Sequence, residues 1–279
     1  MISLKKYNTY AIDAKAEHVY FPKGIQEIVE IYQNHQKVVV LGNGSNVILA
    51  KALYHDCAFV IFSDNFNQIT KQEDGIYAEA GALLRELSLY AYEHKLSGME
   101  TFFDVPASVG GAMIMNTGAY GDEMYDHLCY VNILNLKTNK CERFEKKDID
   151  YGYRYSMFKT MPCLILGAFF HFQAAKQDKI KEKMNHILAQ RMAKLPRNPS
   201  AGSVFKRPKY HITVGEMVEK IGLKGHQIGG AQIANKHGGV IINLGNATGE
   251  DVLKLVLFIK EKIYQHYQVE LVLEQIVVD

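Results

Sequence analysis

Hydrophobic and polar residues alternate along the chain with two different periods. Apolar positions that recur every three to four residues indicate helices, and short apolar or alternating runs indicate strands. We expect helices over residues 24–35, 83–95, 176–193, 213–221 and 250–266. We expect strands over residues 37–41, 58–62, 76–80, 130–134, 164–172, 228–234, 239–243 and 269–278. This mixture predicts an α+β protein with two lobes that separate near residue 190.

The composition narrows the function classes without naming one. The chain has 279 residues, of which 48% are hydrophobic and 22% charged, as in an ordinary globular protein. A formal net charge of +2 does not indicate the strongly basic surface that binds nucleic acid or an anionic membrane. No apolar run approaches the roughly 20 residues needed to span a bilayer, and the N-terminus shows no secretory signal. We therefore expect a cytoplasmic protein that neither binds nucleic acid nor inserts into a membrane.

The four cysteines and eleven histidines show no metal-binding spacing. The cysteines form no C-x-x-C pair, and in a chain without an export signal reduced thiols are expected. We therefore expect no metal site.

A first glycine-rich loop follows the predicted strand 37–41 directly. It consists of Gly42, Asn43, Gly44, Ser45 and Asn46. Glycines let the backbone turn with positive φ, and successive N–H groups beside a hydroxyl can form a concave binding site for a phosphate. A tight turn at the end of the strand is an equally good interpretation. The loop matches neither the dinucleotide-binding fingerprint nor the P-loop.

A second glycine-rich stretch extends from Pro106 to Gly121. Ser108 is expected to cap a short helix that begins with a glycine pair and leaves free N–H groups for a pyrophosphate. Gly118 and Gly121 would let the following backbone pass close to a flat ring. The alternative is a purely structural loop, which would be unusually long for a compact domain.

Together the two loops resemble a known family. LGNGSN at 41–46 and PASVGGAMIMNTGAYG at 106–121 are similar to the FAD-binding loops of the UDP-N-acetylenolpyruvoylglucosamine reductases. Further elements of that family follow in the same order: YGYRYS at 151–156, AGSVFK at 201–206, GGAQ at 229–232, KHGG at 236–239 and LVLE at 271–274. Because the elements are ordered and spread along most of the chain, the resemblance is specific.

The resemblance implies a fold and a division into domains. It implies an FAD-binding domain of the PCMH type (vanillyl-alcohol-oxidase-like) over residues 1–175, built from two α+β lobes at about 1–64 and 65–175. A connector over residues 176–200 would lead to a C-terminal α+β substrate-binding domain over residues 201–279.

The resemblance also implies an activity. The family uses NADPH and FAD to reduce UDP-N-acetylglucosamine enolpyruvate to UDP-N-acetylmuramate, a precursor of peptidoglycan. We expect a monomer that binds FAD non-covalently, since neither glycine loop contains a His or Cys to which flavin could be attached. The FAD-binding residues implied are Gly42, Asn43, Gly44, Ser45, Asn46, Gly81, Pro106, Ser108, Val109, Gly110, Gly111, Asn116, Gly118, Ala119 and Tyr120.

Three matched residues have the chemistry that this reaction needs. Arg154 can stabilise a carboxylate as electrons flow into it, Ser203 can give a proton to the resulting carbanion, and Glu274 can assist at the carboxylate. Each also has a structural interpretation: a turn arginine, a turn or cap serine, and an exposed strand glutamate. The substrate-binding residues implied are Tyr153, Lys206, Arg207, Gln232, Lys236 and His237.

The sequence departs from the family pattern at several positions. The usual L-E-P-E-V appears as LVLEQ at 271–275, and Arg207 stands where many relatives have Asn. The short segment between Phe172 and Ser203 resembles the family's short form, which lacks a substrate-covering loop. Two alternatives remain at this point: an FAD-dependent oxidase of the same superfamily, and a flavin-binding protein without catalysis.

Overall fold

The computed structural model describes residues 1–62, 64–72 and 75–279. The chain forms two compact units. The first unit contains Met1–His18, Gly44–Asp56 and Met192–Asp279, and the second contains Val19–Asn43 and Cys57–Arg191. Strands β2 (Lys15–Tyr20) and β5 (Leu53–Ile61) each begin in the first unit and end in the second. The units combine segments distant in sequence, and the domain ranges expected above stay a prediction.

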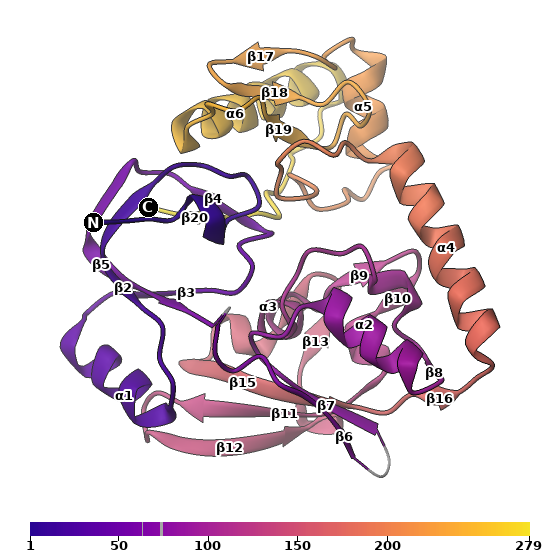
Figure 1. The fold of residues 1–279 in the computed structure, drawn as a ribbon. Coiled ribbons are helices and arrows are strands. Elements are labelled where there is room, and N and C mark those ends of the chain that lie inside the picture. The colour runs from indigo at the N-terminus through magenta and orange to yellow at the C-terminus, as the bar shows by residue number, and fades with distance from the viewer. Residues whose placement is uncertain (63, 73–74) are drawn as a thin grey trace. The chain divides into compact units, whose positions relative to one another are not determined.

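An antiparallel sheet of five strands forms the centre of the second unit (Figure 1). Its order is β12 (Lys140–Glu145), β11 (Leu128–Asn135), β15 (Cys163–Phe170), β7 (Gly75–Glu79) and β6 (Ile69–Gln72). The central strand β15 is buried from Leu164 to Phe170, because it has a neighbouring strand on each side, helices over one face, and side chains of those strands over Phe169 and Gly167, where the rings of Tyr130 and Tyr77 lie. This burial explains its nearly uninterrupted apolar sequence.

Helices α2 (Leu84–Glu93) and α3 (Val109–Met115) lie over one face of this sheet (Figure 1). Helix α1 (Ile25–Asn34) packs its apolar face against the same core, and β3 (Val38–Leu41) pairs in parallel with residues 58–61 of β5. Shorter strands complete the unit: β8 (Leu96–Ser97), β9 (Gly118–Ala119), β10 (Asp122–Glu123), β13 (Tyr151–Gly152), β14 (Tyr155–Ser156) and β16 (Gln173–Ala174). Its 3-10 helices are η2 (Glu100–Phe102), η3 (Met124–Asp126), η4 (Lys146–Asp148) and η5 (Met157–Lys159).

The first unit combines a small antiparallel sheet with two helices. Its sheet consists of β17 (Gln227–Ile228), β18 (Ala231–Ile233) and β19 (Ile241–Asn243), and its helices are α5 (Val214–Lys220) and α6 (Gly249–Tyr267). A parallel pair joins β4 (Val47–Leu49) to β20 (Ile276–Val278). At the N-terminus β1 (Ile2–Ser3) pairs with the start of β2, and η1 (Lys5–Tyr7) follows it.

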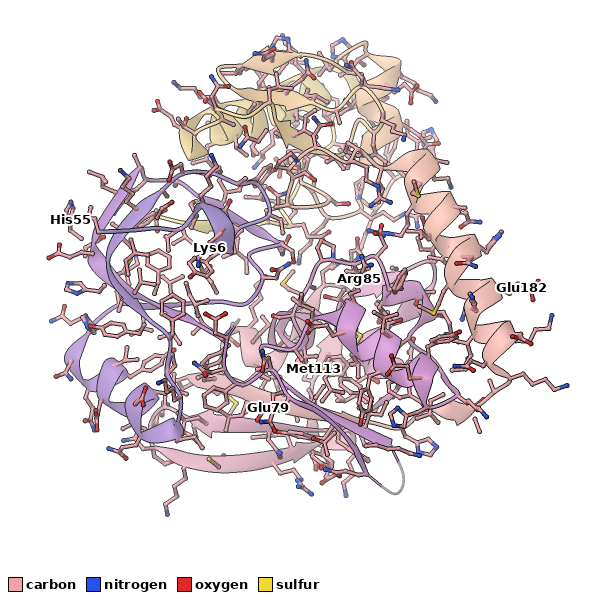
Figure 2. All side chains as sticks on the ribbon, viewed as in Figure 1. Lys6, His55, Glu79, Arg85, Met113 and Glu182 are labelled. Carbon is pink, nitrogen blue, oxygen red and sulfur yellow. The ribbon has the colours of Figure 1, made fainter. Side chains whose placement is uncertain are left out.

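Helix α4 (Gln177–Lys194) belongs to the second unit as far as Arg191 and to the first unit from Met192. Its N-terminal part is mostly exposed, and Glu182, labelled in Figure 2, lies on its outer side, in an ion pair with Lys179. Arg191, nearer its C-terminus, donates through Nε to the Asp104 carboxylate at 2.9 Å and through Nη2 to the Asp104 carbonyl. No helix in the described part of the chain is long and apolar enough to cross a bilayer.

The structure confirms all five helices expected from periodicity, with ends within two residues of the expected ones. The strand expected over 269–278 is wrong in its first part, because regular pairing is limited to Ile276–Val278. The preceding residues instead make a single bridge, between Leu273 and Phe205. The expectation failed because apolar alternation does not reveal where a strand changes partner.

Gly249, the first residue of α6, should be required for the stability of the first unit. A Cβ at this position would collide with the carbonyl of Leu49. Because this neighbour is backbone, it cannot rotate away, and Gly249→Ala should lower the free energy of unfolding by about 1–3 kcal/mol. Urea denaturation measures this change.

The matched control is Glu250→Ala in the same helical turn. The Glu250 side chain is exposed and forms only a surface ion pair with Lys254, so its removal should change the denaturation midpoint far less. Equal effects of the two substitutions would show that the close contact at Gly249 is not the cause.

Candidate functional site

The first glycine loop begins where β3 ends. Within the second unit, Gly42 lies against the start of α3, and a Cβ there would collide with the hydroxyl of Ser108. The Asn43 side-chain amide donates to the carbonyl of Pro106 at 2.8 Å. These two contacts fasten the beginning of the first glycine loop to the beginning of the second. The structure therefore brings together two predicted FAD-binding segments that are about sixty residues apart.

The remainder of the loop belongs to the first unit. Gly44 has φ 58° and lies against the backbone of Tyr7 and Asn8, where no side chain would fit. Asn46 makes two hydrogen bonds to the C-terminal segment. Its side-chain amide donates to the carbonyl of Glu274 at 3.2 Å, and its backbone carbonyl accepts from the amide of Ile276 at 2.8 Å. This loop therefore holds a predicted catalytic residue in place.

Ser108 caps α3 as the sequence predicts. Its hydroxyl accepts from the amide of Gly111 at 3.4 Å. The expectation that the amides of this helix start are free is wrong. Val109 donates to the carbonyl of Ala82, and Gly110 to that of Ala80, each at 2.8 Å. Gly110 thus allows the close approach of α3 to Ala80 at the end of β7, and the sequence pattern alone does not distinguish such a packing glycine from one in an anion site.

Gly81 is also in a close-packed position. Its amide donates to the carbonyl of Phe66 at 2.7 Å, and the carbonyls of Phe62 and Asn65 exclude a Cβ. Two side chains of the same region are labelled in Figure 2. Met113 of α3 is fully buried, and the guanidinium of Arg85 lies 4.9 Å from the centre of the Phe103 ring. The backbone around Gly81 therefore leaves no room for a larger residue at this position.

The residues that remain accessible fit a group such as FAD. In the described part of the chain, the amides of Asn43 and Ser45, both of them partly exposed residues, donate to no backbone carbonyl in a turn or loop. The loop 42–46 contains no acidic residue, so its amides suit a diphosphate. Tyr120 is 41% exposed at φ 52°, and Gly121 has no neighbouring atom within 4 Å of a Cβ position. This open backbone can accept a flat ring.

Asn116 has a buried side chain that organises the second glycine stretch. It is fully buried in the left-handed conformation at the end of α3. Its amide nitrogen donates to the Glu123 carboxylate at 2.7 Å and to the carbonyl of Gly152 at 3.1 Å, and its oxygen accepts from the amide of Tyr125. Asn116 therefore links the glycine stretch to the hairpin that carries Arg154.

Arg154 lies at the tip of the hairpin formed by β13 and β14, with φ 55°. Its Nη2 donates to the carbonyl of Gly118 at 3.0 Å, and its guanidinium carbon lies 5.0 Å from the centre of the Tyr153 ring. At the base of the hairpin, the Ser156 hydroxyl donates to the carbonyl of Ile114. The second unit thus places the predicted cation directly against the predicted flavin-binding backbone.

Ser203 and Glu274 are brought close together within the first unit. Residues 203–205 lie between two other segments: Ser203 bridges Val240, and Phe205 bridges Leu273. The amide of Glu274 donates to the carbonyl of Val204 at 2.9 Å. Ser203 is exposed and Glu274 half-buried. The predicted proton donor and the predicted catalytic carboxyl group therefore occupy neighbouring backbone segments although they are far apart in sequence.

The predicted substrate-binding residues of the first unit lie on several elements. The Lys206 amide donates to the carbonyl of Val272, and the neighbouring Arg207 is exposed. Lys236 donates through its ammonium to the Met192 carbonyl at 2.6 Å. Gln232 on β18 donates through Nε2 to the Gly225 carbonyl at 3.1 Å.

His237 is held as an acceptor. Its Nδ1 accepts from the amide of Gly239 at 3.1 Å, and partial burial lowers the pKa of the imidazole below its ordinary range. A neutral ring is what that hydrogen bond requires. The roles of these residues toward a substrate stay predictions.

Comparison with known proteins decides the family. The family model for the C-terminal domain of UDP-N-acetylenolpyruvoylglucosamine reductase matches residues 193–278, and the model for an FAD binding domain matches residues 16–144. The reductase of Francisella tularensis is 53% identical to this chain over 99% of both sequences. The chain belongs to the UDP-N-acetylenolpyruvoylglucosamine reductase family.

Other members of the reductase family agree with this assignment. The reductase of Latilactobacillus sakei is 37% identical over 96% of this chain and 89% of its own. The crystal structure of the Thermus caldophilus reductase superposes with a TM-score of 0.85 at 29% identity, and covers 100% of this chain and 98% of that one. The expected fold, an α+β FAD-binding domain followed by the family's C-terminal domain, is confirmed.

Family membership also decides between the functional alternatives. The chain is an FAD-dependent oxidoreductase of the reductase family, as predicted, and not an oxidase or a flavin-binding protein without catalysis. FAD is its cofactor, and NADPH is the electron donor of the family's reaction.

The contact of Gly42 with Ser108 predicts a flavin-binding defect. Gly42→Ala should displace the Ser108 hydroxyl and disturb the start of α3. Loss of a helix cap costs about 0.5–2 kcal/mol, so FAD affinity should fall by a factor of up to about 30. Titration of flavin-free protein with FAD, followed by fluorescence, gives this affinity.

The control is Gly24→Ala, also in the second unit, where a Cβ would meet no atom within 4 Å. It should bind FAD as the unaltered protein does. An unchanged affinity in Gly42→Ala would contradict the role given to this contact.

Acid precipitation of the unaltered protein should release all flavin into solution, as non-covalent binding requires.

Proposed function

We propose that Arg154, Ser203 and Glu274 carry the family's reaction in this chain. That reaction is the NADPH-dependent, FAD-mediated reduction of UDP-N-acetylglucosamine enolpyruvate to UDP-N-acetylmuramate in peptidoglycan synthesis. The observation that supports the proposal most directly is the neighbouring placement of Ser203 and Glu274. Their backbone segments are joined by the hydrogen bond from the Glu274 amide to the Val204 carbonyl.

The chemistry of the substrate determines what these residues have to do. The double bond of an enol ether is electron-rich, so hydride adds only if the attached carboxylate can accept electron density. FAD, when bound, takes hydride from NADPH and supplies it to the substrate. The protein must then stabilise the negative charge that develops on the carboxylate and deliver a proton to the adjacent carbon.

Arg154 would stabilise the developing charge. A guanidinium is permanently charged, and its planar fork can donate two hydrogen bonds to a carboxylate. The bond from Nη2 to the Gly118 carbonyl orients that plane beside the glycine stretch. The charge is therefore positioned before the substrate arrives, which reduces the reorganisation needed during the reaction.

Ser203 would donate the proton, and Glu274 would assist at the reacting carboxylate. Ser203 is exposed and follows Gly202, which adopts φ 69°, so its hydroxyl is accessible to a ligand. The carbanion formed by hydride addition is a strong enough base to remove a hydroxyl proton. A half-buried Glu274 can share a hydrogen bond with a substrate carboxylate when it is protonated.

The diphosphate and sugar of the substrate would be bound by the remaining predicted residues. Lys206 and Arg207 follow Ser203 closely, and together they provide two positive charges for a diphosphate. Tyr153 is 49% exposed beside Arg154, so its ring is accessible to a ligand. Gln232, Lys236 and His237 would contribute further polar groups.

We also propose that the enzyme is a cytoplasmic monomer. All the predicted reactive residues are contained in one chain, so no second copy is needed to complete the set. UDP-sugars and NADPH are metabolites of the cytoplasm.

Replacement of Ser203 should separate the two halves of the reaction. Ser203→Ala should leave flavin reduction by NADPH nearly unchanged, because that half requires no proton from serine. Flavin reoxidation by the enolpyruvyl substrate should slow by about 100-fold or more, as expected on loss of a positioned acid. Arg154→Lys should also slow reoxidation, because lysine retains the charge but lacks the planar fork.

Anaerobic stopped-flow absorbance of the flavin follows each half separately. Ser200→Ala, three residues before Ser203, is the matched control and should reoxidise at the normal rate. If Ser203→Ala slowed both halves equally, Ser203 would be structural and the assignment of the acid would fail.

Light scattering after size-exclusion chromatography tests the oligomeric state. A monomer should give a mass near the 31.6 kDa of one chain. Twice that mass at micromolar concentration would contradict the proposal of a monomer without affecting the catalytic roles.

A further inference from the structure

Gln275, the residue after Glu274, has a buried side chain. Both the nitrogen and the oxygen of its amide group form hydrogen bonds inside the first unit. The residue is 3% exposed. Its Nε2 donates to the carbonyl of Ala201 at 2.9 Å and makes a longer contact of 3.4 Å to that of Gly202. Its Oε1 accepts from the hydroxyl of Tyr10 at 3.1 Å. A buried amide in contact with three groups has one fixed orientation.

The two carbonyls that Gln275 holds belong to the residues directly before Ser203. Gly202 turns the chain with φ 69°, and no atom lies within 4 Å of its Cβ position. Packing therefore does not hold this turn from the side. After Ser203, the chain is fixed by backbone bonds of Val204 to Gly239 and Glu274. Before Ser203, the Gln275 amide links the turn to the segment that contains Glu274.

The two backbone carbonyls determine which way the amide faces, and the hydroxyl of Tyr10 fits that orientation. The Tyr10 side chain is fully buried, and burial raises the pKa of its hydroxyl, so it remains a donor. A carbonyl can only accept, so the NH₂ group of Gln275 must face Ala201 and Gly202 while its oxygen faces Tyr10. Tyr10 is itself held through its carbonyl, which accepts from the Asn243 side chain at 2.7 Å.

We propose that Gln275 is a positioning residue for Ser203, an inference that rests on the proposed role of Ser203 as the proton donor. Its amide holds the turn at Ala201–Gly202 in a fixed position relative to the segment that contains Glu274. The Ser203 hydroxyl is thereby held at the reacting carbon. Displacement of a catalytic group by about 1 Å can cost a factor of about 100 in rate, so removal of this tie should impair proton delivery specifically.

The test is Gln275→Met, which preserves side-chain length but removes donor and acceptor. Flavin reduction by NADPH and FAD affinity should stay unchanged, while reoxidation by the enolpyruvyl substrate should slow by about 10- to 100-fold. Gln265→Met, at an exposed position of α6, is the matched control and should be unaffected. Tyr10→Phe should produce a smaller defect in the same half-reaction, and it replaces Gln275→Met if that variant does not fold.

A double-mutant cycle distinguishes positioning from general damage. In the Ser203→Ala background, Gln275→Met should cause no further slowing, because the hydroxyl that it positions is absent. Independent multiplication of the two defects, or equal slowing of both half-reactions by Gln275→Met, would overturn the inference and leave the proposed function standing. If Ser203→Ala alone left reoxidation normal, the proposed role of Ser203 would fail instead, and the inference would fail with it.

Discussion

The first unit depends on the pairing of β20 with β4. Asn46 and Glu274 are 228 residues apart, yet the side chain of Asn46 bonds the carbonyl of Glu274, and the ladder from Ile276 to Val278 continues directly from there. One short parallel pair thus fixes a residue of the first glycine loop, the predicted carboxyl group and the positioning amide of Gln275 relative to one another. The backbone bond between Glu274 and Val204 then extends this order to Ser203.

The second unit holds the charged side chain of Arg154 in a defined direction. Arg154 is placed by a short hairpin whose base is bonded to α3 through Ser156 and whose strand β13 is bonded to Asn116. The glycines around α3 allow backbone to pack against backbone, so the surrounding segment has little freedom to move. Rigidity here is electrostatically useful, because a pre-oriented charge stabilises a developing anion at little cost.

Much of this architecture could be predicted from the sequence. Helical periodicity located the long helices, and Ser108 before a glycine pair correctly indicated a capped helix. Ordered motifs identified the family and its candidate residues. Local patterns did not reveal that the amides of Val109 and Gly110 are used by Ala82 and Ala80, because these partners lie outside the motif.

Near Glu274 the sequence-based prediction also failed because the hydrogen-bond partners are distant in sequence. The run 269–278 alternates like a single strand, but its residues bond first to the segment at 203–206 and then to β4. Gln275 was noted only as a departure from the family pattern, since nothing in a linear sequence connects it to Tyr10. Hydrogen-bond partners of buried polar residues are tertiary information, whereas periodicity and caps are local.

Pairing of β4 with β20 also affects folding during translation, because the two strands are synthesised far apart in time. All residues of the second unit have been synthesised once Arg191 has emerged. The segments Met1–His18 and Gly44–Asp56 cannot complete their packing until residues 276–278 have been synthesised. During translation β4 therefore lacks its partner strand until the last residues have been made. An unpaired strand edge can pair with other chains, so the reductase is exposed to aggregation during this time.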